Sequence, residues 1–174
     1  MQIIYGGIKV KLIIRKATVE DAYNYTDCLI SCLQTAYKGI ASDEFLSNLV
    51  EERDRRAEKF IRNLENPDIE TFLVILESDI IGFLAFHKSD GEIWAIYLLD
   101  GYRHKGYGKE MLDFATNELK QIGHEQITLW VLEKNTDARR FYEKNGFMFD
   151  GTKRENDNYG NMLVQLRYSL NLYE

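Results

Sequence analysis

The sequence predicts one α/β (α+β) domain with a mixed, mostly antiparallel sheet of about seven strands, flanked by about four helices. Two observations lead to this prediction. Three strand-like segments follow one another in the middle of the chain with only short polar turns between them, as in antiparallel hairpins. A helical segment then separates the third strand from a further one, and such a connection typically joins parallel neighbours.

The length and composition fit a single folded domain. The chain has 174 residues, of which 45% are hydrophobic and 13% aromatic. This is enough apolar surface for one core. We therefore expect one domain over residues 1–174, in which residues 1–10 form an N-terminal extension.

The first elements are a strand and a helix. Residues 11–16 (KLIIRK) predict a strand. Thr18 and Asp21 then have the spacing of a capping box, which predicts a helix to about Tyr37, and Gly39 ends it.

A second helix begins near Ser42 and ends before Pro67, the only proline. Its later part carries apolar residues at helical spacing, namely Ala57, Phe60, Ile61 and Leu64. The charged run over residues 51–56 predicts a solvent-facing side of this helix rather than a binding surface.

Three strands are expected next, over residues 70–76, 80–87 and 92–99. The residues between them, Ser78-Asp79 and then 89–91, suit hairpin turns, so these strands form an antiparallel meander.

The last third of the chain alternates helices and strands. The helix after residue 106 ends at Gly123 and has one apolar stripe, made of Met111, Leu112, Ala115, Leu119 and Ile122. A strand follows at 126–132, then a helix after Asn135. Residues 147–173 contain two strands around a polar turn at 155–160.

Charge and hydropathy exclude several classes of protein. The formal charge of −6 and the pI near 5.2 argue against a sequence-independent nucleic-acid surface. The longest apolar runs are far shorter than the ~18 residues of a membrane helix, and the first ten residues (MQIIYGGIKV) lack the regions of a signal peptide. We expect a cytoplasmic protein that binds neither nucleic acid nor membranes.

The two cysteines are expected to be buried thiols. Cys28 and Cys32 are four residues apart in a predicted helix, on one face with Leu29, Leu33 and Ala36. The chain has no Cys-x-x-Cys and its three histidines are scattered, so we expect no metal site.

The most informative segment is the loop that follows the strand at 92–99. It reads Arg103-His104-Lys105-Gly106-Tyr107-Gly108 and leads into a helix. Glycines let backbone N–H groups approach an anion, and the helix N-terminus and nearby basic residues are positive. The loop therefore predicts a diphosphate site, although it matches neither the dinucleotide fingerprint, which needs Gly at position 111, nor a P-loop, which needs Ser or Thr at position 110.

The Arg-x-x-Gly-x-Gly pattern of this loop resembles the acetyl-CoA pyrophosphate loop of the GCN5-related N-acetyltransferase family. Residues 135–147 (NTDARRFYEKNGF) are similar to a second segment of that family, N-x-x-A-x-x-F-Y-x-x-x-G-F. The two motifs occur in the family's order, one helix and one strand apart. The resemblance covers the chain after residue 11 and implies the acyl-CoA N-acyltransferase fold and an acetyl-CoA-dependent N-acetyltransferase that uses no metal.

The resemblance also implies a cofactor site. In the family, the strands at 92–99 and 126–132 splay apart, and the pantetheine arm lies in the gap. The backbone of Ile96, Tyr97 and Leu98 would bind the pantetheine and the thioester oxygen, although Ile96 and Leu98 also suit a core. The diphosphate would be bound by Arg103, His104, Lys105, Gly106, Tyr107, Gly108 and Lys109.

Two residues of the second motif are implied to act directly. In the family the residue matching Asn135 contacts the cofactor, and the one matching Tyr142 protonates the CoA thiolate. Seven residues apart on a helix, both lie on one face, and a phenol is protonated at neutral pH. The alternatives are that Asn135 is only an N-cap and that Phe141 and Tyr142 are core aromatics.

The general base, the acceptor and the oligomeric state stay open. Some family members carry a Glu five residues before the Asn, where this chain has Trp130, so Glu92, Glu133 or water could take the amine proton. Negative charge, including Glu155 and Asp157, favours a small cationic acceptor, such as a polyamine or an aminoglycoside-like molecule.

Three further expectations concern the acceptor, the class of protein and the oligomeric state. A peptide N-terminus or lysine is the alternative acceptor and would be favoured by an open groove beside residues 37–40. A non-catalytic acyl-CoA sensor is the alternative of another class. By family habit we expect a homodimer that uses residues 161–170 or the stretch before residue 11.

Overall fold

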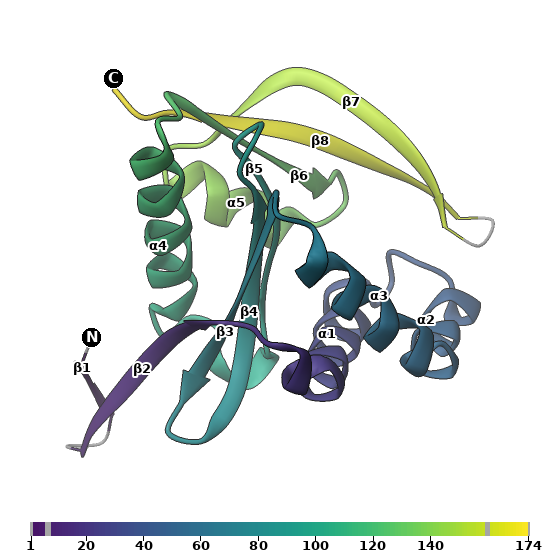
Figure 1. The fold of residues 1–174 in the computed structure, drawn as a ribbon. Helices are drawn as coiled ribbons and strands as arrows, with labels where there is room; N and C mark the ends of the chain where they lie inside the picture. Colours follow the sequence, from purple (N-terminus) through teal and green to yellow (C-terminus); the bar gives the residue numbers. More distant parts are fainter. Residues whose placement is uncertain (1, 6–7, 159–160, 174) are drawn as a thin grey trace.

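The computed structural model describes residues 2–5, 8–158 and 161–173. Its strands form a sheet in the order β1-β2-β3-β4-β5-β6-β8-β7 (Figure 1). Their bounds are β1 Gln2–Tyr5, β2 Ile8–Lys16, β3 Ile69–Leu76, β4 Asp79–His87, β5 Glu92–Leu98, β6 Gln126–Leu132, β7 Met148–Asn158 and β8 Asn161–Asn171. Neighbouring strands are antiparallel except β5 and β6, which are parallel. The predicted mixed, mostly antiparallel sheet is confirmed.

Helices cover both faces of this sheet. They are α1 Ala22–Ala36, α2 Asp43–Glu51, α3 Arg53–Glu65, α4 Tyr107–Ile122 and α5 Thr136–Lys144, with short 3-10 turns η1 Val19–Asp21 and η2 Asp100–Tyr102. Figure 1 shows α4 on one side of β3–β5 and α1–α3 on the other, while the β7–β8 hairpin arches beyond them. The β7–β8 end of the sheet is therefore less covered by helices than its centre.

The core lies mainly between the sheet and α4. Met111, Leu112 and Ala115 of α4 are buried against strand residues such as Leu84 and Val131. The stripe ends at Leu119, since Ile122 in the last turn of α4 is half exposed.

The opposite face is packed by α1. Cys28 and Cys32 of α1 are buried against Leu73 and Phe83 of the sheet, which confirms the prediction of buried thiols. Phe83 and Leu84 are adjacent in β4 but belong to different hydrophobic clusters, because successive side chains of a strand point to opposite faces of the sheet.

The parallel strands β5 and β6 separate soon after they meet. Their pairing is confined to Glu92 with Thr128 and Ile93 with Leu129. On the other side of β5, a bulge leaves Trp94 unpaired while Ile93 and Ala95 pair with β4. A bulge bends and twists a strand, and this one occurs where the β5–β6 pairing ends. The splay implied by the family resemblance is therefore present.

Three boundaries differ from the sequence prediction. The second helix is two helices, α2 and α3, which meet at Glu52; no apolar residue lies between Val50 and Ala57 to hold a continuous helix on the core. The N-terminal extension contributes β1, and its backbone pairs with β2. The turn expected at 155–160 is shorter, because residues up to Asn158 pair with β8, while positions 159–160 lie outside the described residues.

An ion pair fixes the start of α1. The Asp21 carboxylate accepts two hydrogen bonds of 2.7 Å from the Arg15 guanidinium, and a third from the Thr18 N–H at 2.8 Å. The pair joins β2 to η1 and thereby sets where α1 leaves the sheet. The hydrogen bonds from Arg15, followed by those from Thr18, lower the pKa of Asp21 to about 2.

We predict that Asp21→Asn lowers the free energy of unfolding by about 1–2 kcal/mol at pH 7, a value reduced for the partial exposure of Arg15. Because the folded pKa is depressed, the stabilisation exists above the unfolded pKa of about 3.9 and is lost as the pH falls toward 2. Urea unfolding of both proteins between pH 7 and pH 2.5 measures it.

Asp27→Asn is the matched control, since Asp27 pairs with Arg53 at the exposed surface. We expect a loss below about 0.5 kcal/mol for that variant. A difference between wild type and Asp21→Asn that stays constant down to pH 2.5 would contradict the role of the carboxylate charge.

Candidate active site

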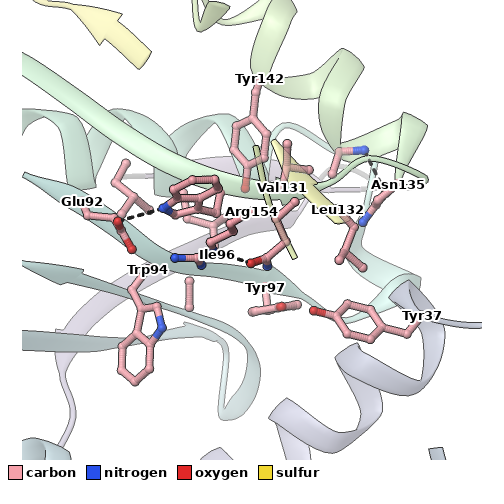
Figure 2. A pocket seen from close by; sticks show the side chains of 15 residues that line it. Tyr37, Glu92, Trp94, Ile96, Tyr97, Val131, Leu132, Asn135, Tyr142 and Arg154 are labelled. Carbon is pink, nitrogen blue, oxygen red and sulfur yellow. Dashed lines mark hydrogen bonds between the residues drawn. The ribbon is translucent and has the colours of Figure 1, made fainter. Parts of the chain in front are cut away.

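A pocket of about 210 Å³ lies where β5 and β6 diverge (Figure 2). Its walls come from β5, β6, α5, the β7–β8 hairpin and the end of α1. They consist of Tyr37, Glu92, Ile93, Trp94, Ala95, Ile96, Tyr97, Trp130, Val131, Leu132, Asn135, Ala138, Tyr142, Arg154 and Gln165. The pocket therefore joins several of the residues singled out in the sequence with others that no motif marks.

The splayed part of β5 exposes its backbone to the pocket. Ile96, Tyr97 and Leu98 pair with β4, but their other edge has no partner on β6, whose pairing ends at Ile93. Gly82 of β4 allows this arrangement, because a Cβ there would lie 2.4 Å from the Tyr97 carbonyl oxygen. Ile96 and Leu98 also pack against the core, so a structural and a binding role coexist.

Asn135 and Tyr142 lie on the same face of α5, as their spacing predicts. The Asn135 side-chain oxygen accepts a hydrogen bond of 3.1 Å from the Ala138 N–H, which makes Asn135 the N-cap of α5. Both residues also line the pocket. In Figure 2 the ring of Tyr142 points from α5 into the pocket, toward the strands below it.

The Tyr142 phenol is a protonated group in a dry environment. Only 9% of the residue is exposed, and burial raises the pKa of Tyr142 to about 12. The hydroxyl therefore carries its proton throughout the neutral range and is available as a proton or hydrogen-bond donor to a group in the pocket.

Tyr37 and Tyr97 form the opposite wall. Burial raises the pKa of both phenols. Figure 2 shows the Tyr37 hydroxyl pointing toward Tyr97. Tyr37 comes from the end of α1 and is therefore a wall of the pocket on the side of residues 37–40, where an open groove would favour a peptide acceptor.

The basic loop forms a separate group of residues at the start of α4. Gly106 is the N-cap of α4 with φ of 93°, a conformation that favours glycine, and His104 is also left-handed with φ of 60°. In the described chain, no backbone carbonyl accepts from the N–H groups of His104, Gly106, Tyr107 or Gly108. Such N–H groups at a helix N-terminus are an anion site.

The two glycines of the loop have different structural reasons. Gly106 is required by its φ, whereas Gly108 lies inside α4, where a Cβ would touch the Phe141 ring at 3.5 Å. The Phe141 ring of α5, one residue before Tyr142, therefore lies close to Gly108 of α4. None of residues 103–109 lines the pocket itself.

The charged side chains of the loop have protein partners. Arg103 reaches Asp100 at 3.6 Å and the Leu98 carbonyl at 3.5 Å, and Lys109 pairs with Asp113. A bound diphosphate would compete for these basic groups, so the backbone N–H groups are the part of the site that is available without rearrangement.

The two candidate bases have different surroundings. Glu92 lines the pocket, and its carboxylate accepts a hydrogen bond of 3.1 Å from the Trp130 indole N–H. Glu133 instead pairs with Lys153 at 2.7 Å, which lowers the pKa of Glu133, and it does not line the pocket. Trp130, at the position where some family members carry a Glu, thus holds the carboxylate of another residue.

Sequence reasoning missed the contribution of Tyr37, Trp94, Arg154 and Gln165. Trp94 is the bulge residue of β5, and Arg154 and Gln165 face each other across the β7–β8 pair. No short sequence motif indicates that these residues line the pocket, because the register between neighbouring strands places them there. Asp157, one of the two acidic residues used to argue for a cationic acceptor, has a side chain outside the described part of the structure.

Comparisons with known proteins agree with this geometry. The profile described as "Acetyltransferase (GNAT) family" matches residues 35–147. Spermidine N(1)-acetyltransferase of Thermoplasma acidophilum is 28% identical over 144 residues, which is 80% of this chain and 89% of that protein. Aminoalkylphosphonate N-acetyltransferase of Salmonella typhimurium is 28% identical over 96 residues, covering 51% and 62% of the two chains.

A solved structure adds the cofactor. The PaiA N-acetyltransferase of Thermoplasma acidophilum, crystallised in complex with coenzyme A, aligns with a TM-score of 0.73 at 25% identity. The alignment covers 92% of this chain and 99% of the other. Acetyl-CoA is therefore the co-substrate of this protein. Among the described residues, no cluster of His, Cys, Asp and Glu side chains could hold a metal ion.

No helix in the described part of the chain combines the length and the apolar character needed to span a bilayer.

We predict that Gly108→Glu abolishes coenzyme A binding without unfolding the chain, because it places a carboxylate beside the unpaired N–H groups. Gly108→Ala is the control, since its Cβ makes an ordinary contact with Phe141 and carries no charge. Calorimetry with coenzyme A and circular dichroism of both variants measure the effect. Unchanged affinity in a folded Gly108→Glu protein would remove the diphosphate from this loop.

Proposed function

We propose, from the premise that this chain belongs to the acetyltransferase (GNAT) family and is an acetyl-CoA-dependent N-acetyltransferase, that it acetylates a primary amine of a small molecule in the pocket between β5 and β6. The observation that supports this most is the convergence of the free edge of β5, the Tyr142 hydroxyl and the Glu92 carboxylate on one pocket.

The proposed reaction is a direct transfer within a ternary complex. The amine nitrogen attacks the thioester carbonyl carbon, a C–N bond forms, and the C–S bond breaks. Backbone N–H groups of residues 96–98 stabilise the negative charge that develops on the carbonyl oxygen. The departing thiolate takes the proton of the Tyr142 hydroxyl, and the proton that the nitrogen loses as the amide forms returns to the phenolate.

We assign the general base to Glu92 rather than Glu133. An ammonium group must lose its proton before it can attack, and the acceptor of that proton has to reach the pocket. Glu92 does so, with its carboxylate oriented by the Trp130 indole, whereas Glu133 is engaged by Lys153. The Trp130 hydrogen bond leaves oxygen lone pairs of Glu92 available to the amine or to a water.

The size of the pocket supports a small acceptor. About 210 Å³ is below the roughly 300–1,000 Å³ of typical ligand pockets, which favours a short amine over an aminoglycoside-sized one. A polyamine is supported by the net charge and by the name of the Thermoplasma relative. The Salmonella relative is named for a different acceptor, an aminoalkylphosphonate, so the names alone do not decide.

The peptide acceptor and the sensor are less well supported. Tyr37 lines the pocket on the side where an open groove would have favoured a peptide, and a protonated Tyr142 phenol in the pocket supports catalysis over mere binding. The homodimer stays a prediction, for which light scattering near twice 20.4 kDa is the check. Because β8 is paired on both sides, the strand edges available for it are those of β1 and β7.

A thiol-release assay with acetyl-CoA and a panel of small amines tests the proposed function. We expect turnover with at least one small amine and none with a peptide N-terminus. A protein that binds acetyl-CoA and releases no thiol with any acceptor would be a sensor instead.

We predict that Tyr142→Phe lowers kcat by roughly 10²-fold, about 2.7 kcal/mol of transition-state stabilisation, while the affinity for acetyl-CoA changes little. The phenyl ring keeps the packing against Phe141 and Phe147, and only the proton donor is removed. Tyr168→Phe, another buried tyrosine outside the pocket, is the control and should keep its kcat. A twofold loss in Tyr142→Phe with chemistry rate-limiting would make Tyr142 a packing residue.

A further inference from the structure

Arg154 brings a positive charge into the pocket of an enzyme whose overall charge is negative. Its side chain is one of the pocket walls, although the sequence placed it at the edge of a polar turn. It is exposed, so an acceptor entering from solvent can reach it. In Figure 2 it lies near the centre of the pocket, among Ile96, Val131 and Tyr142 in this view.

Two contacts hold the guanidinium in place. Its central carbon lies 4.1 Å from the centroid of the Trp130 ring, and its Nε donates a hydrogen bond of 2.7 Å to the Gln165 side-chain oxygen. Asn156 donates to the same Gln165 oxygen at 2.6 Å, which fixes that oxygen in turn. An arginine stacked on an aromatic ring and anchored through Nε presents its terminal N–H groups in a set direction.

Arg154 differs from the other basic residues near it. Lys153 pairs with Glu133, and Arg167, which is 6.0 Å from the same Trp130 ring, pairs with Asp150. For Arg154, no carboxylate among the described residues lies within ion-pair distance. Among the described residues, its neighbours position the guanidinium, and none pairs with its charge or with its terminal N–H groups.

We propose that Arg154 binds an oxyanion carried by the acceptor, so that the acceptor is a small primary amine with a carboxylate or phosphonate group. The proposal rests on the proposed function and narrows its substrate class. The guanidinium fork matches the two oxygens of such a group and binds it bidentately.

The two charged groups beside Trp130 fit such a molecule. Glu92 accepts from the indole N–H, and Arg154 lies over the ring face, so a negative and a positive group flank one side chain. An amine that also carries an oxyanion has the complementary pair of charges. A diamine would instead place its second ammonium near an unneutralised guanidinium, where like charges repel.

The experiment compares amines of matched length with the wild-type enzyme. One series contains ω-amino acids of increasing chain length together with 3-aminopropylphosphonate, and the other contains the diamines of the same lengths. Butylamine serves as an amine without a second charge. We expect the anionic amines to exceed the matched diamines in kcat/KM by roughly 10-fold or more. Higher kcat/KM for diamines throughout the series would overturn the proposal while leaving the acetyltransferase assignment intact.

Variants separate recognition from structure. We expect Arg154→Met to raise KM for the anionic amines by roughly 10-fold or more with kcat within about 3-fold, and to raise the KM for butylamine far less. Arg154→Lys should raise the KM for the anionic amines less than Arg154→Met does, because lysine keeps the positive charge but lacks the paired N–H donors of the guanidinium. Arg167→Met is the control, because Arg167 is already neutralised by Asp150, and it should change neither series.

The remaining outcomes are also decisive. A KM for anionic amines that Arg154→Met does not change would overturn the proposal, and so would an equal rise in KM for butylamine, which would indicate a general change of pocket shape. Absence of turnover with every amine of both series would contradict the proposed function itself.

Discussion

The site depends on one interruption in the hydrogen bonding of the sheet. β5 and β6 pair at only two positions, and the bulge at Trp94 reorients β5 at the same level. If the pairing continued, the N–H and C=O groups of residues 96–98 would be satisfied by β6 and unavailable to any ligand. The divergence converts a strand edge inside the sheet into a binding surface, and Gly82 lets β4 stay close enough to keep that edge in place.

The remaining parts of the site are arranged around this gap by short local structures. The left-handed Gly106 starts α4 with N–H groups that no backbone carbonyl of the described chain pairs, and the N-cap Asn135, which lines the pocket, starts α5. The Phe141 ring of α5 lies close to Gly108 of α4. A diphosphate bound at α4 and a thioester held against β5, as we propose, would have their separation set by this packing.

Features that depend on neighbouring residues could be predicted from the sequence, and those that depend on strand register could not. The loop glycines, the cap at Asn135 and the Asn135–Tyr142 face follow from local backbone geometry, so a motif is enough to find them. The break at Glu52 depends on how α2 and α3 each pack against α1. Arg154 and Gln165 reach the pocket only because β8 is placed between β6 and β7, an order that no local pattern contains.

The net charge of the chain says little about the acceptor, for a physical reason. A formal charge of −6 describes the potential averaged over the whole surface, and charges farther apart than about 8–10 Å are largely screened at physiological ionic strength. An acceptor in the pocket interacts mainly with the groups that line it, and these include the carboxylate of Glu92 and the guanidinium of Arg154. In the recognition that we propose, a local pair of opposite charges, one at the edge and one over the face of Trp130, therefore matters more than the total charge of the chain.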